Sequence, residues 1–322
     1  MDKISWKGTN VLVTGADGFI GSHVAKMLVG KGSEVITIVR DIKKRSNIDI
    51  FGLKEKITVI NGDIVNFADC ERVINEYDIN FCFHIAAQAI VGPANRSPFS
   101  TFESNIKGTW NVLEACRLSK TTKGLIVASS DKAYGQQEKL PYTEESPLNG
   151  YFPYDASKAC AEILARCYSM SYNLQLAITR NANTYGPADM NMSRIIPDAI
   201  SKLLNCKQLV IRSDGTPERD YMYVKDAVNA YIMLAENLHR KEVVGQAFNF
   251  GTGKPISVLD LYSKITKLMG KKAKPQILGE AKNEIDRQYL SIEKAKRILK
   301  WQPKYTIDQG LKETIKWYRD NL

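Results

Sequence analysis

Along the first 180 positions of the chain, runs rich in β-branched residues alternate with segments in which apolar residues recur at helical spacing. Runs rich in β-branched residues predict strands at 10–15, 34–40, 57–64, 79–87 and 124–130, and a further strand opens 174–186. Apolar residues at helical spacing predict helices at 19–32, 69–78, 99–119 and 154–172. The repeated order of strand, helix and strand predicts a parallel sheet. Because the strands are apolar throughout, helices should cover both of its faces.

The pattern loosens after about residue 180, where loops lengthen and strands shorten. Amphipathic helices are predicted there at 193–205, 225–240, 257–269 and 307–322. We therefore predict an α/β fold with a doubly wound parallel sheet over 1–180 and a return segment near 221–251. A smaller C-terminal α/β lobe should occupy 181–322 and rest on the ends of the sheet.

The composition is that of a soluble globular protein, with 44% apolar and 25% charged residues among 322. We expect no membrane span, which needs roughly 20 consecutive apolar residues, and no signal peptide, because the polar N-terminus leads directly into a strand. The six cysteines form no CxxC pair. Buried free thiols in a reducing compartment are therefore favoured over disulfides or a metal site, and the cytoplasm is the predicted location.

The formal charge of +10 raises the question of a polyanionic partner. The lysines and arginines are scattered, and the tightest clusters, at 43–45 and 271–274, hold only three each. This dispersion argues against nucleic acid as a partner. A protein that binds several anionic phosphates explains the charge equally well.

The first predicted strand runs into Gly15-Ala-Asp-Gly18-Phe-Ile-Gly21 and then into a helix. Glycine at these positions allows a tight turn, lets the backbone approach a pyrophosphate and lets the helix pack close to the strand. The helix N-terminus then offers N–H groups and a positive dipole end to the phosphates. In this context the motif predicts a Rossmann-type site for NADP or NAD, in which we include Asp17, Phe19 and Ile20.

The end of the second strand bears on the choice of cofactor. NAD-binding proteins usually place an acidic residue about 20 positions after the glycine turn to hold the ribose 2′-OH. Here Val39 stands at that place and Arg40 follows it. An arginine can bind a 2′-phosphate, which favours NADP, whereas Asp41 keeps NAD open. Asp63 is placed to reach the adenine amino group, with an ordinary loop or cap aspartate as the alternative.

Tyr154 and Lys158 form a YxxxK pair, which shares one face of the predicted helix. A phenol with a pKa of about 10 is a poor base near neutrality. A nearby ammonium and a nicotinamide cation would lower that pKa, so the phenolate could take a proton from a sugar hydroxyl. Ser130, at the tip of the preceding strand, could hydrogen-bond the same hydroxyl.

The chain resembles the extended short-chain dehydrogenase/reductases that act on nucleotide-sugars. The resemblance spans nearly the whole chain and rests on GADGFIG, NGDI, FHIAAQ, SNIKGTWNVLEA, ASSDKAYG, YDASK, NTYGP, RDYMYVKDA, FNFGTG and LKWQPKYTIDQGLKETIKWY. It implies a Rossmann lobe for the cofactor and a C-terminal lobe for a nucleotide-diphosphate sugar. It also implies a homodimer through the helices 99–119 and 154–172, with a tetramer left open.

The resemblance also implies roles for individual residues. Ser130, Tyr154 and Lys158 become the catalytic set, and Asn105 steadies the active-site backbone. The implied cofactor contacts further include Ile64, Ala86, Ala87 and Gln88, besides Tyr154 and Lys158. The implied substrate contacts are Asn183, Arg194, Arg212, Arg219 and Arg287. The late arginine of the family is a departure, because the spacing puts Lys282 at its position and Arg287 is the nearest arginine.

Asp131 and Lys132, directly after the catalytic serine, bear on which reaction the chain catalyses. A 4-epimerase needs no further acid, whereas a 4,6-dehydratase needs a base for the C5 proton and an acid for the C6 hydroxyl. Asp-Lys here is similar to cytidine-diphosphate-glucose 4,6-dehydratases, while 34–48 resembles the guanosine-diphosphate-mannose enzymes. We predict a 4,6-dehydratase of a GDP- or CDP-linked hexose, or of an N-acetylhexosamine, with Asp131 as the acid.

Three alternatives stay open at this point. Lys132 is either the C5 base or only a partner of Asp131 or a phosphate. The enzyme could be a 4-epimerase of the same fold. Outside catalysis, the chain could be a binding protein that senses NADP, although an intact Ser130, Tyr154 and Lys158 argues against this.

Overall fold

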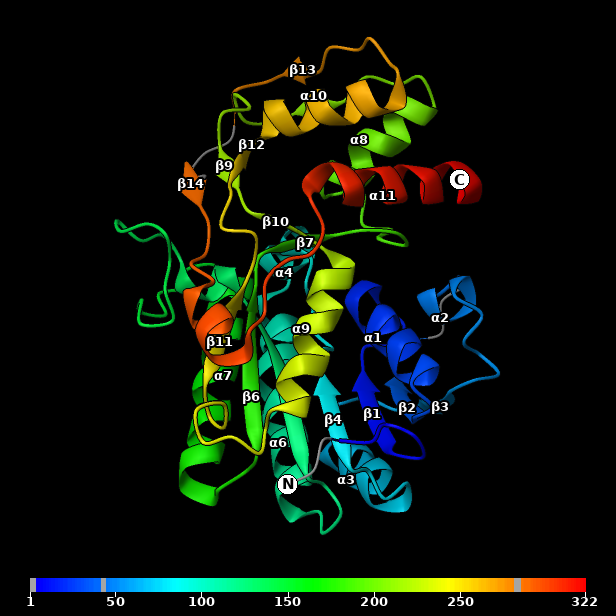
Figure 1. Ribbon diagram of the computed structural model, residues 1–322, viewed down its shortest axis with the longest axis vertical. Coiled ribbons are helices and arrows are strands. Elements are labelled where there is room, and N and C mark those ends of the chain that lie inside the picture. The colour runs from blue at the N-terminus through cyan, green and yellow to red at the C-terminus, as the bar shows by residue number, and fades with distance from the viewer. Residues whose placement is uncertain (1–3, 42–44, 281–284) are drawn as a thin grey trace.

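The apolar runs of the first half form one parallel sheet (Figure 1). The computed structural model describes residues 4–41, 45–280 and 285–322. Within them, the sheet has seven strands in the order β11-β6-β5-β4-β1-β2-β3, and every pair is parallel. Its strands are β1 (Asn10–Thr14), β2 (Glu34–Val39), β3 (Thr58–Asn61), β4 (Phe81–His84), β5 (Gly124–Ser130), β6 (Leu176–Asn181) and β11 (Ala247–Phe250). The predicted fold class is confirmed.

Helices cover both faces of the sheet because alternate strand residues point to opposite sides. Val11 and Val13 of β1 join the core formed with α1 (Phe19–Gly30) and α9 (Val224–Glu236). Leu12 joins the core on the other face. That second core includes α3 (Phe67–Glu76), α6 (Gly108–Leu118) and α7 (Pro153–Tyr172).

The helix predicted at 99–119 is not one regular helix. It is divided into α5 (Pro98–Phe102), a π-helical turn (Glu103–Lys107) and α6. The Thr109 hydroxyl donates to the carbonyl oxygen of Asn105 at 2.6 Å and so competes for a helix acceptor. Sequence periodicity also gave no sign of the short helices α2 (Asn47–Ile50) and α4 (Val91–Arg96).

The second half of the chain leaves the sheet and returns to it. After β6, β7 (Asn183–Tyr185) pairs with β10 (Tyr221–Tyr223), and β11 then joins the sheet beside β6. Two small sheets follow, β12-β9-β14 and β13-β8. Their strands are β8 (Val210–Ile211), β9 (Glu218–Arg219), β12 (Ile256–Ser257), β13 (Gln276–Ile277) and β14 (Arg287–Gln288).

Three helices complete this half: α8 (Ile195–Leu204), α10 (Val258–Met269) and α11 (Ile307–Asn321). They gather at one end of the molecule, beyond the ends of the central strands (Figure 1). A π-helical turn (Ala295–Leu299) lies beside β11. The division into lobes at residue 180 stays a prediction.

The cysteines differ from the expectation of buried thiols. Cys70, Cys82 and Cys116 are buried, whereas Cys160, Cys167 and Cys206 are exposed, and all six are free. Cys160 and Cys167 lie on α7, and Cys206 lies in the loop after α8. Apolar neighbours in the sequence do not guarantee burial at such positions. Among the described helices, none is both long enough and apolar enough to span a bilayer.

Candidate functional site

The predicted cofactor residues meet at one edge of the sheet. The glycine turn follows β1, Arg40 follows β2, Asp63 and Ile64 follow β3, and Ala86 to Gln88 follow β4. Because these strands are parallel, all four segments lie at the same carboxyl edge. Ligands of open α/β sheets bind at that edge.

The glycine turn leaves no room for side chains. A Cβ on Gly21 would lie 2.1 Å from the carbonyl oxygen of Gly15, and one on Gly15 would lie 2.9 Å from the backbone of Ala86. Gly15 also has a φ of +75°, which favours glycine. Gly18 has no side chain with which to cap α1, so the first N–H groups of the helix can meet an anion. The turn therefore fits a dinucleotide pyrophosphate.

Arg40 and Asp41 bind each other at the end of β2. The guanidinium contacts the Asp41 carboxylate at 2.7 and 2.8 Å, and more than half of each side chain is exposed. The pKa of Arg40 is raised, first by this hydrogen bond and also by the charges of Asp63 and Asp17. The positive charge that favoured NADP is thus already partnered.

Asp63 has a structural task in its own loop. One carboxylate oxygen accepts a hydrogen bond from the backbone N–H of Val65 at 3.0 Å. The alternative of a loop aspartate thus has direct support, while its role toward adenine stays a prediction. Ile64 packs against Gly108, where a Cβ would meet the Ile64 side chain at 2.7 Å.

A buried chain of hydrogen bonds begins beneath the glycine turn. Thr14 Oγ1 accepts from the N–H groups of Ile85 and Ala86, both at 3.1 Å, so its own proton goes to Nδ1 of His84 at 2.9 Å. His84 Nε2 therefore carries a proton and donates to Thr109 Oγ1 at 2.9 Å. Burial, and to a lesser extent the charge of Lys158, lowers the pKa of His84 to about 3, which keeps the ring neutral.

The series of hydrogen bonds continues to α7, the helix that carries Tyr154. Asn105 accepts from the Gln88 N–H at 2.7 Å and donates to Ser157 Oγ at 2.9 Å. Ser157 in turn donates to the carbonyl oxygen of Tyr154 at 2.7 Å. These bonds tie the loop after β4 to the start of α7, and the backbone-steadying role of Asn105 stays a prediction.

Ser130, Tyr154 and Lys158 converge where β5 ends against α7. Burial raises the pKa of Tyr154 to about 12, while a hydrogen bond with Ser130 and the charge of Arg194 lower it. Lys158 donates to the carbonyl oxygen of Ala128 at 2.8 Å, and burial lowers its pKa to about 8. The three predicted catalytic residues are thus brought together.

Asp131 and Lys132 lie on the helical turn 131–134, next to Ser130. Asp131 is only 2% exposed, and it accepts from Ser130 Oγ at 3.1 Å and from Lys132 Nζ at 3.4 Å. Lys132 Nζ also donates to Oε1 of Gln288. Asp155, the neighbour of Tyr154, is buried. Burial raises its pKa, the charge of Lys132 lowers it and the charge of Asp131 raises it.

The predicted substrate residues are only partly gathered. Asn183 on β7 donates to the carbonyl oxygen of Asp220 at 3.3 Å, and Arg194 at the start of α8 pairs with Asp189 at 3.0 Å. Arg194 lies over the Phe19 ring at 5.9 Å, beside the glycine turn.

Three further arginines belong to the small sheets. Arg219 on β9 lies opposite Gln288 of β14, and Arg287 pairs with Glu218 at 2.5 Å. Arg212 is exposed and directly follows β8, the strand that pairs with β13; Figure 1 shows β13 far from the central strands. Lys282 lies outside the described residues.

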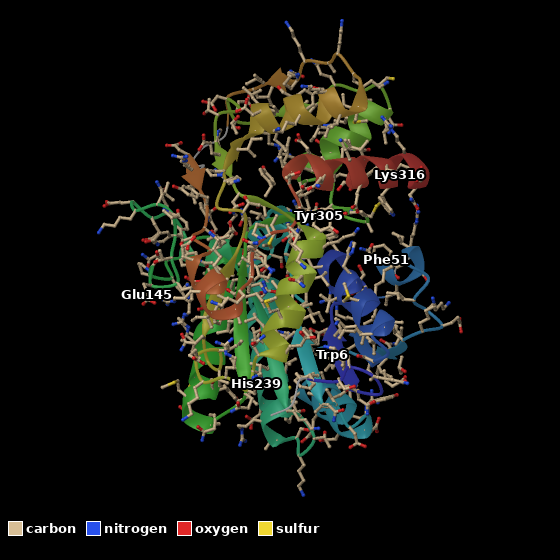
Figure 2. The ribbon with its side chains drawn as sticks, in the orientation of Figure 1. Trp6, Phe51, Glu145, His239, Tyr305 and Lys316 are labelled. Atoms are coloured by element: carbon tan, nitrogen blue, oxygen red, sulfur yellow. The ribbon has the colours of Figure 1, made fainter. Side chains whose placement is uncertain are left out.

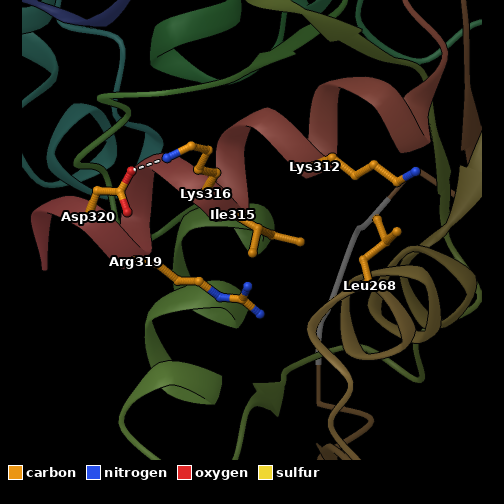
Figure 3. Close-up of a pocket in the computed structure, with 6 residues that line it drawn as sticks. All are labelled: Leu268, Lys312, Ile315, Lys316, Arg319 and Asp320. Atoms are coloured by element: carbon orange, nitrogen blue, oxygen red, sulfur yellow. Dashed lines mark hydrogen bonds and ion pairs between the residues drawn. The ribbon is translucent and has the colours of Figure 1, made fainter.

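Two surface hollows lie elsewhere, along α10 and α11. One of about 360 Å³ is lined by Leu268, Lys312, Ile315, Lys316, Arg319 and Asp320 (Figure 3), and Lys316 is paired with Asp320 at 2.7 Å. The other, of about 520 Å³, also includes Leu268. Both are lined by residues other than the predicted site residues, so volume alone does not locate the chemistry.

Sequence reasoning missed buried residues that lie next to the predicted site residues. His84 lies within FHIAAQ, and Asp155 and Ser157 lie within YDASK, yet none was given a role. A histidine inside an apolar strand just before a cofactor loop was an available signal. On α1, His23 contacts Phe51 (labelled in Figure 2), with ring centroids 4.8 Å apart. Gln288 carried no sequence signal, because its contact crosses 156 positions.

The sequence matches a protein family over residues 12–314, and the family is described as GDP-mannose 4,6 dehydratase. A UDP-glucuronate 4-epimerase of Thermodesulfobacterium geofontis is 31% identical and covers 97% of this chain and 96% of its own. A CDP-glucose 4,6-dehydratase of Salmonella typhimurium is 29% identical, covering 99% and 93%.

A trifunctional UDP-glucose 4,6-dehydratase, 3,5-epimerase and reductase of Arabidopsis thaliana is 32% identical over the whole chain, which spans about half of that relative's length. Among solved structures, a dTDP-glucose 4,6-dehydratase of Streptomyces venezuelae with NAD bound has a TM-score of 0.87. It is 26% identical, and the match covers 97% of this chain and 98% of that one. Dehydratases and epimerases both appear among these relatives.

Proposed function

The chain belongs to the GDP-mannose 4,6 dehydratase family, and from this premise we propose that it is a nucleotide-sugar 4,6-dehydratase. Its substrate is a nucleotide-diphosphate hexose, linked to GDP or CDP, and an N-acetylhexosamine falls within this class. The product is the 4-keto-6-deoxy sugar. The observation that carries this proposal is the buried Asp131 carboxyl between Ser130 and Lys132, because an epimerase needs no acid there.

The first step needs a base at the sugar 4-hydroxyl. Tyr154 takes that proton, Ser130 hydrogen-bonds the same oxygen, and Lys158 stabilises the phenolate by its charge. The pKa of Tyr154 is raised to about 12, chiefly by burial, so positive charge nearby is required for this task. The glycine turn and the N-terminus of α1 would hold the dinucleotide, which would supply the hydride acceptor for C4 of the sugar and the hydride donor for C6.

The second step removes water across C5 and C6. Lys132 is the proposed base for the C5 proton, and its Nζ contacts Asp131 and Gln288. Asp131 gives its own proton to the leaving C6 hydroxyl. The pair then stands as carboxylate and ammonium, and one proton crossing the 3.4 Å contact restores it.

We propose NAD as the dinucleotide. The prediction of NADP rested on Arg40, which forms an ion pair with Asp41 at 2.7 Å. The Streptomyces venezuelae dehydratase was solved with NAD. In titrations followed by tryptophan fluorescence, NAD should bind at least about tenfold more tightly than NADP, which corresponds to roughly 1.4 kcal/mol. Tighter binding of NADP would restore the role first given to Arg40.

We also propose that the chain forms a homodimer through α5, α6 and α7. Large apolar side chains are exposed there: Phe99 is 77% exposed, Trp110 48%, Ile163 58% and Met170 82%. Exposed apolar patches of this kind mark association surfaces. A second copy of the same face would cover them, as in other isologous dimers. The cytoplasm remains the proposed location.

Asp131→Asn tests the dehydratase proposal. The substrate is a panel of nucleotide-hexoses, read by mass spectrometry and by absorbance of the reduced cofactor. The wild-type protein should yield a product lighter by one water. The variant should still reduce its cofactor but lose elimination by about a hundredfold to ten-thousandfold, the usual contribution of a positioned acid.

Two outcomes would count against this assignment. A product isomer of unchanged mass from the wild-type protein would favour the 4-epimerase, the alternative supported by the Thermodesulfobacterium relative. Product formation by Asp131→Asn at the wild-type rate would remove Asp131 from the mechanism. Thermal melts of both proteins serve as the control for folding.

A further inference from the structure

Gln288 reaches from the C-terminal half of the chain into the turn that carries Asp131 and Lys132. It lies on β14. The residues before and after it in the sequence are exposed and half-buried, respectively, yet Gln288 itself is fully buried. A glutamine at the edge of a small two-residue strand has no core to fill there. Its burial is explained by what its amide contacts across the two halves.

The Gln288 amide binds both residues of the pair. Its Oε1 accepts a hydrogen bond from Lys132 Nζ, and its Nε2 donates to the carbonyl oxygen of Asp131 at 3.0 Å. Only this orientation of the amide satisfies both partners. Turning it over would set Nε2 against the amine hydrogens and Oε1 against the carbonyl oxygen. One side chain therefore fixes Lys132 Nζ relative to the Asp131 backbone.

The backbone of Gln288 is held on both sides. Its carbonyl oxygen accepts from the Asp220 N–H at 3.2 Å. One residue further, Tyr289 accepts from the Tyr142 N–H at 3.0 Å, and Ser291 donates to the carbonyl oxygen of Tyr142 at 2.8 Å. Tyr142 belongs to the first half of the chain and is fully buried. The amide thus rests on a rigid bridge between the two halves, which suits a group that positions others.

We propose that Gln288 is the positioning residue for elimination. Gln288 and Asp131 each accept a hydrogen of Lys132 Nζ, and together they fix the position from which that nitrogen takes the C5 proton. Gln288 acts on the water-loss step and not on the hydride step, because its amide contacts Lys132 and Asp131, whereas Lys158 is held by the carbonyl oxygen of Ala128. This inference rests on the proposed 4,6-dehydratase function and deepens it.

The test compares Gln288→Leu and Gln288→Glu with the wild-type protein in single turnovers. Gln288→Leu removes both hydrogen bonds at similar volume. Gln288→Glu keeps an acceptor for Lys132 but sets a second acceptor against the Asp131 carbonyl oxygen. In both variants the reduced cofactor should form at the wild-type rate and then accumulate. Loss of water should slow by about tenfold to a hundredfold, the scale expected when a catalytic group is displaced by about 1 Å.

Gln276→Leu is the matched control, because it makes the same chemical change at an exposed position of β13. It should leave both steps unchanged. In a double-mutant cycle, Gln288→Leu should add little to the elimination defect of Asp131→Asn, since both act through one pair. A purely structural role would instead lower cofactor reduction and water loss together, and the melting temperature with them.

The outcomes separate the inference from the function on which it rests. Water loss at the wild-type rate in Gln288→Leu overturns the inference and leaves the dehydratase function standing. Equal slowing of cofactor reduction and water loss also overturns it. A wild-type protein that yields only an isomer overturns the proposed function, and the inference falls with it.

Discussion

At the scale of single residues, Asp155 shows how burial alters a group that the sequence leaves unremarked. The residue is 8% exposed beside Tyr154. Burial raises its pKa from 3.8 to about 6, while Lys132 opposes the rise and Asp131 adds to it. Between these two values the folded protein holds a proton that the unfolded chain has released. The free energy of unfolding contributed by Asp155 therefore falls as the pH rises from about 4 to about 6.

Asp155→Asn should remove this loss. At pH 7 the variant should be more stable than the wild-type protein, by at most about 3 kcal/mol on the scale of 1.36 kcal/mol for each unit of pKa. At pH 4 the two proteins should unfold nearly alike, because Asp155 is protonated in the fold. Thermal melts at pH 4, 5, 6 and 7 measure the difference. A gap that stays constant across these pH values would show that the shift is not the cause.

Residue chemistry could be predicted where local spacing carries it. The glycine turn and the pair Tyr154 and Lys158 each depend on neighbours in sequence, and the structure brings them to one edge of the sheet. The preference for NADP that was inferred from Arg40 is not supported, because Arg40 forms a salt bridge with the next residue, Asp41. Spacing shows which residue stands at a position but does not show what already binds it.

At the scale of elements, α7 and β6 are joined by a buried ion pair below the catalytic residues. Glu162 follows Lys158 by one turn of α7, so it points to the same inner side. Its carboxylate meets the guanidinium of Arg180, with Nε to Oε2 at 2.9 Å, and both side chains are at most 1% exposed. Arg180 also donates to Tyr134 and to the carbonyl oxygen of Glu144. This group fixes α7 against the turn that carries Asp131.

Glu162→Ala should lower the free energy of unfolding by about 3–5 kcal/mol, because it leaves the Arg180 charge buried without its carboxylate. Urea denaturation measures this loss. The control is Glu76→Ala, which breaks the exposed pair with Arg72 and should cost less than about 1 kcal/mol. Equal losses of unfolding free energy in the two variants would contradict the claim that burial makes the Glu162–Arg180 pair more costly to break.

Elements could be predicted where one regular pattern continues along the whole segment. The strand at 124–130 and the helix near 154–172 have the predicted bounds to within one residue, because each packs along its whole length. The helix at 99–119 is interrupted by the π-helical turn at 103–107, which periodicity does not indicate. Strands β8, β9 and β12 to β14 have two residues each, too few to show any period.

At the scale of the whole molecule, the fold follows from apolar strands covered on both faces, and it was predictable for that reason. How the two halves meet was not, since the contacts between Gln288 and the turn at Asp131 join distant parts of the chain. The exposed apolar face of α5, α6 and α7 concerns a still larger unit, the proposed dimer.

Trp110→Glu combined with Met170→Glu should convert this dimer into a monomer. Both side chains are exposed in the single chain, so the change should cost little in its own stability but place charge in the buried interface. Size-exclusion chromatography with light scattering measures the mass. The control is Ile277→Glu, an apolar residue 47% exposed on β13, which should leave the dimer intact. A monomeric wild-type protein would contradict the proposed interface.

The central claim, that this protein dehydrates a nucleotide-sugar, is tested most directly by following one hydrogen. The substrate is a nucleotide-hexose carrying deuterium at C4, and the product is read by mass spectrometry and NMR. A 4,6-dehydratase should give a product lighter by one water with the deuterium at C6. Deuterium retained at C4 of an isomer with unchanged mass would contradict the claim.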